Sequence, residues 1–490
     1  MEIDDRAGST RSAAWIVLGV VALLLALSGR YGYHRDELYF IEAGERLAWG
    51  YVDQPPLTPL VASLTEPFGY ALPALRLLPA LSIGAIVWFA AAFAARFGGG
   101  SFARVLAALA AGLAPIFLAV GHLLATTTFD ALIWVALAYL AVRIVQTDDQ
   151  HWWLLFGIVV GIGLLNKWTI LYLIGGLGLG LVLTEQRRVF RSPFLWAGAA
   201  IALAIWLPNL LWQAEHDWPF FEMARALHDE GVEDANSFLF VPLQFLLIGP
   251  VTAPIWIGGL RRLFRDPEVR PYRFLGWAFL ILAVAFIAVS AKPYFLTPLY
   301  VPLLGAGAVA AERRLTDRRP AALRGVAIGG LVALPLVLPV LPAGTLADLP
   351  VINEINPELA ETHGWESFVE QVAERFDTVP LDQRERATVF TGNYGEAGAI
   401  DRYRAGTDLP SGSSGHNSYW LWGPPNGAPV LIVGHFSPEY LDERFLELRM
   451  VGTIQNPAGL QNEEHGASVW IAAGPRGSWD ENWPSLRHFN

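Results

Sequence analysis

Eleven apolar runs occupy most of the first 341 residues, and they restrict the fold more than any other feature of this sequence. A helix that crosses a membrane needs about 20 largely apolar residues. Only 16% of all residues are charged, whereas soluble domains carry about 25%. We therefore predict a mainly α-helical, multi-pass protein of the lipid bilayer with about eleven transmembrane helices. The predicted spans are Ala13–Ser28, Leu72–Phe97, Phe102–Val120, Thr128–Gln146, His151–Leu165, Trp168–Thr184, Pro193–Trp212, Phe238–Leu260, Tyr272–Ser290, Pro293–Ala311 and Leu323–Leu341.

The basic residues predict the orientation of these spans. Segments that would be cytoplasmic if the N-terminus is inside hold most of the arginines, and cytoplasmic loops are enriched in Lys and Arg. An odd number of spans then places everything after Leu341 outside. We predict a plasma (inner) membrane protein with a cytoplasmic N-terminus. The basic residues of the opposite loops are Arg30, Arg35, Arg46, Lys167, Arg225 and Lys292.

Chemically useful side chains collect on the predicted outer face. Asp36 and Glu37 are adjacent in an aromatic segment that follows the first span, and Asp53 precedes two prolines in the continuation of that segment. Neighbouring carboxylates repel each other, and apolar surroundings make their charged forms costly. We expect a loop that binds a cation or takes up a proton, with a solvated turn at the membrane surface as the alternative.

Composition excludes several classes of function. The net charge of −11 argues against nucleic acid as a partner, because binding to its phosphates needs a basic surface. The chain has no cysteine, so it forms no disulfide and no cysteine metal site.

We predict two domains: a membrane domain of residues 1–342, followed by a small extracytoplasmic α/β domain of residues 343–490. Thr388–Thr391, Pro429–Val433 and Ala467–Ala472 read as short buried strands. The segment Gly392-Asn-Tyr-Gly-Glu-Ala-Gly398 joins a strand to a predicted helix over Ala397–Tyr403, and we attribute its glycines to turn geometry. Leu409–Asn417 is rich in Gly and Ser and predicts a surface loop.

Five short motifs, in order and all on the predicted outer face, resemble those of a known family. This chain is similar to the GT-C membrane glycosyltransferases, and within them to the dolichyl-phosphate-mannose–protein mannosyltransferase family (glycosyltransferase family 39) with its bacterial aminoarabinose-transferase branch. The motifs are Arg35-Asp-Glu37, Tyr51-Val-Asp-Gln-Pro-Pro56, Thr127-Thr-Phe-Asp130, Leu165-Asn-Lys-Trp168 and Ala291-Lys-Pro-Tyr-Phe-Leu-Thr-Pro298.

The resemblance implies a GT-C fold and an inverting transfer of a sugar. The donor would be a polyprenyl-phosphate sugar, and the acceptor would be a hydroxyl of a protein, a lipid or a cell-wall glycan. Such a reaction needs a general base for the acceptor hydroxyl and positive charge for the leaving phosphate.

The resemblance assigns catalysis to three carboxylates. Asp36 matches the first-loop Asp of the family and is the expected base. Glu37 orients the site, or is itself the base if the register is shifted by one. Asp130 matches the second acidic position and is expected to position the acceptor or support Asp36. The alternative for Asp130 is an N-cap, because Thr-Thr-Thr-Phe-Asp suits a helix start.

Asp53 matches a position at which the aminoarabinose branch carries a metal-binding Glu. In that branch the next residue is Lys, whereas this chain has Gln54. This departure argues against both a metal at Asp53 and a phosphate contact at position 54. His34, His122, His216 and His228 are further sources of metal ligands without a helical ligand spacing. We expect no required cofactor, with a divalent metal as the alternative.

Three basic residues and one tyrosine are the remaining candidates for binding the donor phosphate. Arg35, Lys167 and Lys292 each lie at an outer end of a span, where the alternative is that the side chain reaches the interface without binding substrate. Tyr294 would bond the same head group or belong to the aromatic belt.

Two other functions are compatible with this composition. A transporter or flippase of a lipid-linked sugar should carry ionisable residues near the membrane midplane, whereas here they gather at one face. A receptor whose outer domain binds a ligand leaves the acidic segment after the first span without a role. We therefore favour the enzyme.

Overall fold

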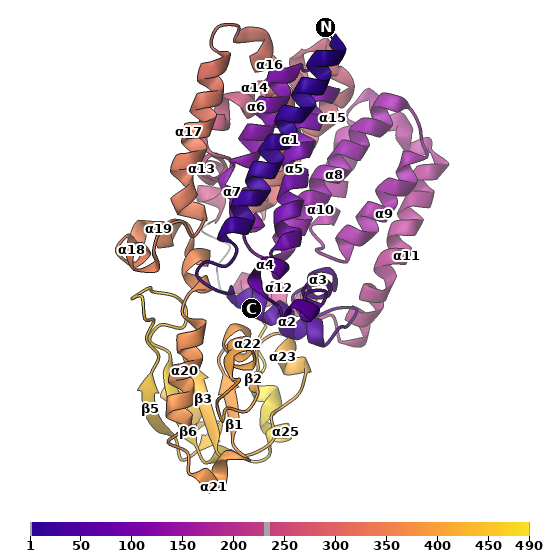
Figure 1. Cartoon of the computed structure of the whole chain (residues 1–490). Helices are drawn as coiled ribbons and strands as arrows, with labels where there is room; N and C mark the ends of the chain where they lie inside the picture. The colour runs from indigo at the N-terminus through magenta and orange to yellow at the C-terminus, as the bar shows by residue number, and fades with distance from the viewer. Residues whose placement is uncertain (1, 230–235, 490) are drawn as a thin grey trace.

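The structure is a computed structural model that describes residues 2–229 and 236–489. A bundle of helices carries a small α/β domain at one end, as Figure 1 shows. The N-terminus lies at the far end of the bundle, and the C-terminus lies at the junction with the α/β domain. The bundle helices are α1 (Glu2–Leu27), α5 (Leu77–Arg96), α6 (Ser101–Gly112), α7 (Pro115–Gly121), α8 (Thr126–Thr147), α9 (Trp152–Leu164), α10 (Ile170–Val182), α11 (Pro193–Glu215), α13 (Asn236–Ile248), α14 (Ala253–Arg265), α15 (Arg273–Ala288), α16 (Tyr300–Arg314) and α17 (Arg319–Val337).

The eleven predicted runs all reappear as helical segments in the described residues. Six are long and apolar enough to cross a membrane, and the pairs α6–α7 and α13–α14 add two if each bent pair is one span. The other three, Arg11–Leu27, α9 and α10, are apolar but shorter. Thirteen residues of helix rise about 20 Å, so α9 and α10 alone fall short of a hydrocarbon core of about 30 Å.

The outside of the bundle matches a lipid environment. Only 11% of the apolar window of α17 and 17% of that of α11 is buried against protein. Large side chains such as Val284 and Val332 are exposed. Contiguous exposed apolar surface of this kind is typical of contact with a membrane.

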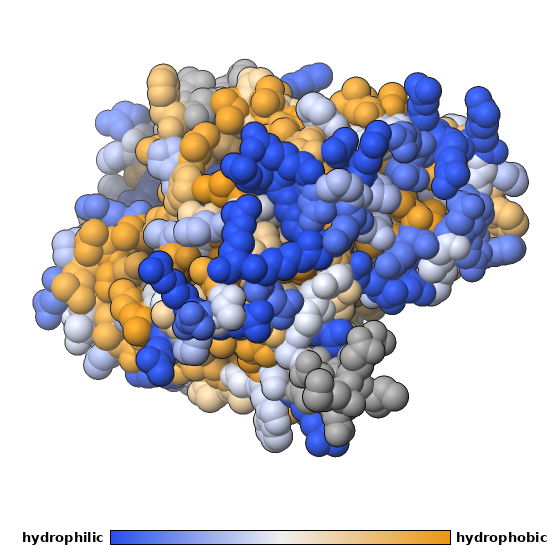
Figure 2. Space-filling model, turned by 90° about the horizontal axis from the view of Figure 1, so that it is seen from above, coloured by the Kyte–Doolittle hydropathy of each residue, from blue (hydrophilic) through white to orange (hydrophobic). Residues whose placement is uncertain are grey.

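The end of the bundle that carries the N-terminus is polar. Figure 2 views the molecule from this end: hydrophilic side chains gather across the face, and apolar ones occupy much of its rim. Ion pairs such as Arg270–Glu185 and Arg313–Glu268 join the connections between helices in this part of the bundle. This distribution agrees with a membrane-embedded body, whereas the predicted orientation of the N-terminus stays a prediction.

The acidic segment after the first span is helical, so the prediction of a loop is wrong. The chain forms α2 (Arg35–Glu45), α3 (Leu57–Ser63), the 3₁₀ turn η1 (Glu66–Phe68) and α4 (Leu72–Leu75) before α5 begins. Together with α12 (Pro219–Asp229), α2 and α3 lie at the end of the bundle that faces the α/β domain (Figure 1). Asp36 and Glu37 therefore stand in the first turn of α2.

The α/β domain is built on a five-stranded mixed sheet with the order β2-β1-β3-β6-β5. The three predicted strands are confirmed as β1 (Thr388–Thr391), β3 (Val430–Gly434) and β6 (Ser468–Ala472). The Gly/Ser-rich segment is not a surface loop, because it forms the buried edge strand β2 (Gly412–Ser414). The other elements are β4 (Phe445–Leu446), β5 (Arg449–Thr453), β7 (Gly474–Pro475), η6 (Pro357–Thr362), α20 (Trp365–Phe376), α21 (Leu381–Arg384), α22 (Tyr394–Tyr403), α23 (Ser418–Leu421), α24 (Pro438–Asp442), α25 (Trp479–Asn482) and η7 (Trp483–Leu486).

Helix α22 packs directly on α2 and brings the two parts of the chain together. A Cβ on Gly398 would lie 3.1 Å from backbone and side-chain atoms of Leu38, and one on Gly395 would lie 2.8 Å from Cβ of Arg35. Both glycines are inside a helix, so the interpretation of these two as turn residues is wrong. They permit close approach of the two helices. The short helices α18 (Ala343–Ala347) and α19 (Pro350–Ile355) connect the bundle to the α/β domain, and the boundary at residue 342 stays a prediction.

Candidate active site

The start of α2 fixes the two adjacent carboxylates in different surroundings. His34 is the N-cap: its Nδ1 accepts a hydrogen bond from the Asp36 amide at 3.1 Å, and its own amide donates to Glu37 Oε2 at 2.9 Å. This is a capping box, which the sequence supports because Glu37 is the third residue of the helix. Successive residues on a helix point about 100° apart. Asp36 and Glu37 therefore face different partners.

Glu37 is completely buried in an ion pair with Arg76. Arg76 Nε and Nη2 donate to the two carboxylate oxygens at 2.9 and 2.6 Å, and the Leu124 amide donates to Oε1 at 2.8 Å. Arg76 also donates to the carbonyls of Ser28 and Gly32, at 2.6 and 2.7 Å. Because both oxygens of Glu37 are occupied by strong donors, this carboxylate is suited to fixing α2 against α5 and not to taking a proton from a substrate.

Asp36 remains accessible. Its side chain is 37% exposed, and its Oδ1 accepts a hydrogen bond from the hydroxyl of Tyr394 at 2.8 Å. Tyr394 is the first residue of α22, so the α/β domain holds the carboxylate that the first motif supplies. His34 Nδ1 and Arg35 Nε each lie 4.0 Å from one of the Asp36 oxygens. A partly exposed carboxylate that is oriented by a hydroxyl donor has the geometry of a general base.

Two tyrosines in contact, Tyr39 and Tyr394, connect Asp53 with Asp36. Tyr39 donates to Asp53 Oδ1 at 2.7 Å, and the rings of Tyr39 and Tyr394 are 4.7 Å apart. Burial, partly offset by the bond from Tyr39 and reinforced by the charge of Asp36, raises the pKa of Asp53 to about 7. Asp53 can thus exchange a proton near neutral pH.

The connection that holds Asp53 and Gln54 is fixed by contacts with two other parts of the chain. Ser418 of the α/β domain accepts the amide of Val52 at 3.1 Å, and Gln213 at the end of α11 donates to the Tyr51 carbonyl at 3.3 Å. Gln54 is 4% exposed, and within the described part of the chain neither polar atom of its amide has a hydrogen-bond partner. An unpaired buried amide is costly, so Gln54 is a group that a ligand would satisfy.

Arg35 and Lys292 lie on the side of α2 that faces η6. Arg35 forms an ion pair with Glu463 of the α/β domain. Lys292 is exposed, and its charge helps to lower the pKa of Glu358. The larger influence on Glu358 is its contact with His34 Nε2 at 2.7 Å, and together they lower that pKa to about 2. Burial lowers the pKa of His34, but Glu358 and the carboxylates of α2 raise it above its usual value.

A second group gathers where α8, the connection before α10 and η5 (Pro293–Leu299) meet. A small cavity is lined by Asp130, Thr127 and Tyr294. Lys167 Nζ lies 3.4 Å from Thr127 Oγ1 and 5.6 Å from the centroid of the Tyr294 ring. Thus Asp130, Lys167 and Tyr294, which come from three different motifs, are brought together.

Asp130 is not a helix cap. Helix α8 begins at Thr126 after Ala125, and Asp130 lies in its second turn, where it accepts a hydrogen bond from Thr169 Oγ1 at 2.7 Å. The N-cap alternative is therefore wrong. The carboxylate is buried, and its position favours support of Lys167 and of the cavity wall over contact with bulk water.

The candidate histidines are dispersed. His34 contacts Glu358, His122 Nε2 lies 3.4 Å from Arg76 Nη1, and the His216 ring stacks on Trp212 at 4.1 Å. The side chain of His228 lies outside the described residues. The expectation that the reaction requires no metal stays a prediction.

Comparison with known proteins agrees with this arrangement. Residues 53–212 match the profile of the dolichyl-phosphate-mannose-protein mannosyltransferase family. The lipid A galacturonosyltransferase RgtD of Rhizobium johnstonii is 25% identical over 344 residues, which are 66% of this chain and 70% of that protein. The undecaprenyl phosphate-alpha-4-amino-4-deoxy-L-arabinose arabinosyl transferase of Edwardsiella ictaluri is 29% identical over 210 residues, 38% of this chain and 36% of its own.

The fold extends the likeness over almost the entire chain. The crystal structure of ArnT from Cupriavidus metallidurans bound to undecaprenyl phosphate has a TM-score of 0.60 with this structure, at 19% identity, and the match covers 95% of this chain and 98% of ArnT. This chain resembles the GT-C membrane glycosyltransferases. Its fold is GT-C-like, mainly helical with a small C-terminal sheet region.

In this GT-C-like chain, reasoning from the sequence missed three residues of the site. Arg76 is a charged residue one turn inside an apolar run, and such a residue is a sequence signal for a functional or structural ion pair. Tyr39 lies in the aromatic segment after the first span, and its local sequence does not distinguish it from the other aromatic residues there. Tyr394 lies 358 residues from Asp36, and nothing in its local sequence points to the acidic segment.

Proposed function

We propose that this protein is an inverting glycosyltransferase that moves a sugar from a polyprenyl-phosphate donor to an acceptor hydroxyl, with Asp36 as the general base. The observation that carries this proposal is the partly exposed carboxylate of Asp36. Tyr394 orients it at the end of the bundle where the α/β domain packs. A lipid-linked donor presents its phosphate at a membrane surface, and a site at the end of the bundle can meet it there.

The reaction follows from the two groups of residues. Asp36 accepts the proton of the acceptor hydroxyl as its oxygen forms a bond to the anomeric carbon. The bond between that carbon and the phosphate oxygen breaks, and its electron pair leaves with the polyprenyl phosphate. Attack on the side opposite the phosphate inverts the anomeric carbon. Lys167, half-buried beside Thr127 and Tyr294, stabilises the negative charge that develops on the leaving phosphate.

The remaining carboxylates have supporting roles. Asp130 accepts from Thr169 and fixes the cavity beside Lys167. Glu37 and Arg76 hold α2 in place. Asp53 and the unpaired amide of Gln54 are near Asp36 and are suited to hydroxyl groups of the sugar or of the acceptor. We assign this site to the outer face of the inner membrane, with the N-terminus in the cytoplasm.

The distribution of buried charge favours an enzyme over a transporter. Among the described residues of the helical part, the buried Asp, Glu and Arg side chains are Glu37, Glu42, Arg76, Asp130 and Arg262. Asp130 is in the second turn of α8, and Arg262 is in the last turn of α14, paired with Asp266. A transporter would concentrate such groups near the middle of its spans.

The decisive experiment compares the purified wild type with Asp36→Asn. We would measure the release of free polyprenyl phosphate from a panel of polyprenyl-phosphate-linked sugars, with lipid A among the acceptors because RgtD is a lipid A galacturonosyltransferase. General-base catalysis contributes roughly 10²–10⁴-fold, so turnover should fall by that order while donor binding persists.

Glu45→Gln is the matched control, since Glu45 is an exposed carboxylate on the same helix. It should leave turnover unchanged. Equal turnover in Asp36→Asn and wild type would remove Asp36 as the base. Scrambling of the donor across vesicles without any transfer would favour a flippase.

A further inference from the structure

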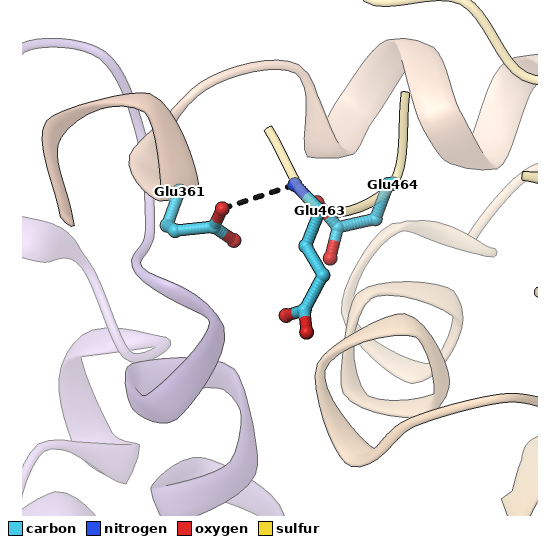
Figure 3. Close-up of side chains that lie close together, drawn as sticks. All are labelled: Glu361, Glu463 and Glu464. Atoms are coloured by element: carbon cyan, nitrogen blue, oxygen red, sulfur yellow. Dashed lines mark hydrogen bonds between the residues drawn. The ribbon is translucent and has the colours of Figure 1, made fainter. Parts of the chain in front are cut away.

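Three glutamates of the α/β domain converge beside the start of α2. Glu361 comes from η6, and Glu463 and Glu464 come from the connection between β5 and β6. One carboxylate oxygen of each lies within 4.8 Å of the others, and Figure 3 shows the three side chains gathered around one small space. The Glu463 amide donates to Glu361 Oε1 at 3.0 Å, which fixes the two segments relative to each other.

The buried members of this cluster have unused oxygens. Glu464 is 2% exposed, and within residues 11–227 and 238–489 neither of its carboxylate oxygens has a hydrogen-bond partner. Glu361 is 9% exposed, and its Oε2 likewise has none there. By contrast, the buried carboxylate of Glu396 accepts from the amides of Gly392 and Asn393. A buried carboxylate without donors requires a proton or a cation.

The charge balance leaves a deficit of positive charge. Within the described residues, one cation forms an ion pair with the cluster: Arg35 pairs with the exposed carboxylate of Glu463. Three carboxylates and one guanidinium leave two negative charges. The ionised cluster is therefore strained unless a positive ion enters.

We propose that Glu361, Glu463 and Glu464 bind one calcium ion that joins η6 to the connection between β5 and β6. The ligand set consists of oxygens alone, which suits a hard cation. Ca²⁺ binds oxygens at about 2.3–2.6 Å, so opposite ligands stand about 4.6–5.2 Å apart, and the spacing of the three oxygens fits within that span. Glu463 is exposed, so water can complete the shell.

The bound ion would strengthen the junction between the two parts of the chain. Glu463 also contacts Arg35, the first residue of α2, and His435 Nε2 lies 2.9 Å from the Glu463 carbonyl. The ion thus fixes a segment that already reaches α2 from the α/β domain. This site is separate from Asp53 and does not depend on the proposed glycosyl transfer.

The test uses the full chain in detergent after treatment with a chelator. We would measure binding of CaCl₂ by calorimetry and thermal unfolding at increasing CaCl₂, with MgCl₂ as a comparison, at pH 7.5. We expect one Ca²⁺ per chain, with a Kd on the order of 10⁻⁵–10⁻³ M, and a rise in the unfolding temperature. Glu464→Gln and Glu463→Gln should each weaken binding at least tenfold.

Two variants keep the test decisive. Glu463 is exposed, so Glu463→Gln should fold even if Glu464→Gln does not. Glu481→Gln removes an exposed carboxylate elsewhere in the same domain and should bind Ca²⁺ like the wild type. The proposal is wrong if the wild type neither binds Ca²⁺ nor is stabilised by it, since a proton shared by Glu361 and Glu464 would then neutralise the pair. It is also wrong if both glutamine variants bind Ca²⁺ normally.

Discussion

Adjacent residues in this protein have opposite surroundings. Asp36 and Glu37 differ by one methylene and one position, yet Asp36 is partly exposed while Glu37 is sealed against Arg76. The rotation of the helix by about 100° per residue separates the two side chains. The carboxylate of Asp36 is therefore partly accessible to solvent, whereas that of Glu37 holds the helix that carries both.

Replacing Glu37 should affect stability before it affects chemistry. Glu37→Gln leaves the guanidinium of Arg76 buried without its counterion, and removal of one partner of a buried pair costs about 3–5 kcal/mol. We expect a clear fall in the unfolding temperature of the purified protein. Asp36→Asn is the matched control and should unfold like the wild type, whereas the double variant Glu37→Gln/Arg76→Gln should lose less than the sum of the single variants. Equal stability of Glu37→Gln and wild type would contradict this role.

The two lysines near the site should differ in their effect on the donor. Lys167 is half-buried beside Thr127 and Tyr294, whereas Lys292 is exposed near Glu358. A charged hydrogen bond contributes about 1.5–3 kcal/mol, so Lys167→Met should raise the KM for the donor roughly tenfold or more. Steady-state kinetics with varied donor would show this. If Lys292→Met has the larger effect, the donor phosphate binds near Lys292 and not near Lys167, which would contradict this prediction.

At the scale of elements, the contact between α2 and α22 is the decisive one. The glycines of α22 let it approach the backbone of α2, and that approach carries the Tyr394 hydroxyl to Asp36. The tilted rings of Tyr39 of α2 and Tyr394 of α22 then contact each other and connect Asp36 with Asp53. The site is therefore shared between a membrane-proximal helix and the α/β domain.

A methyl group at this contact should separate the two helices. A Cβ on Gly398 would lie 3.1–3.2 Å from backbone and side-chain atoms of Leu38, so Gly398→Ala forces α22 outward by a few tenths of an ångström. Overpacking costs about 1–3 kcal/mol, and kcat should fall because the bond from Tyr394 to Asp36 lengthens. Turnover and thermal unfolding would both be measured.

Two further variants separate packing from hydrogen bonding. Gly178→Ala in α10 adds a methyl that meets nothing within 4 Å and should be neutral in both measurements. Tyr394→Phe removes the hydroxyl without widening the contact, so it should lower kcat while the KM for the donor is kept. Full activity in Gly398→Ala and in Tyr394→Phe would show that α22 does not position Asp36.

At the scale of the molecule, buried carboxyls concentrate where the bundle meets the α/β domain. Burial is the main cause that raises the pKa of Glu42 and of Asp53 to about 7, and that of Glu396 to about 8. The folded protein therefore holds protons that the unfolded chain has already released at neutral pH. Stability should fall as the pH rises through 7–8, because the folded state binds more protons than the unfolded state.

The unfolding temperature should thus be higher at pH 6.5 than at pH 8.5. Each such carboxyl contributes up to about 1.4 kcal/mol per pH unit between its unfolded and folded pKa. Glu358, with a pKa lowered to about 2, makes the free energy of unfolding rise with pH instead. It stays ionised between pH 6.5 and 8.5, so it does not change the result in this range. Glu396→Gln should flatten the dependence. Glu481→Gln, at the same capping-box position in α25 but exposed, should leave it unchanged, and a rise in stability toward pH 8.5 would refute the assignment.

The sequence alone determined the class of the protein. Apolar runs such as Thr128–Gln146 are local in the chain, and any fold that leaves them in water is excluded, so the helical membrane bundle and the three buried strands could be predicted. The five short motifs indicated which residues gather at one end, and Lys167, Asp130 and Tyr294 do meet there.

The tertiary structure decided what each of those residues contacts. That Asp36 is held by Tyr394 while Glu37 is occupied by Arg76 depends on the packing of α22 and α5 against α2, between segments separated by 358 and 39 residues. The local sequence does not reveal such a contact, because a glycine such as Gly398 is equally compatible with a turn and with a close helix–helix contact. Only the assembled chain distinguishes the accessible carboxylate from the buried one.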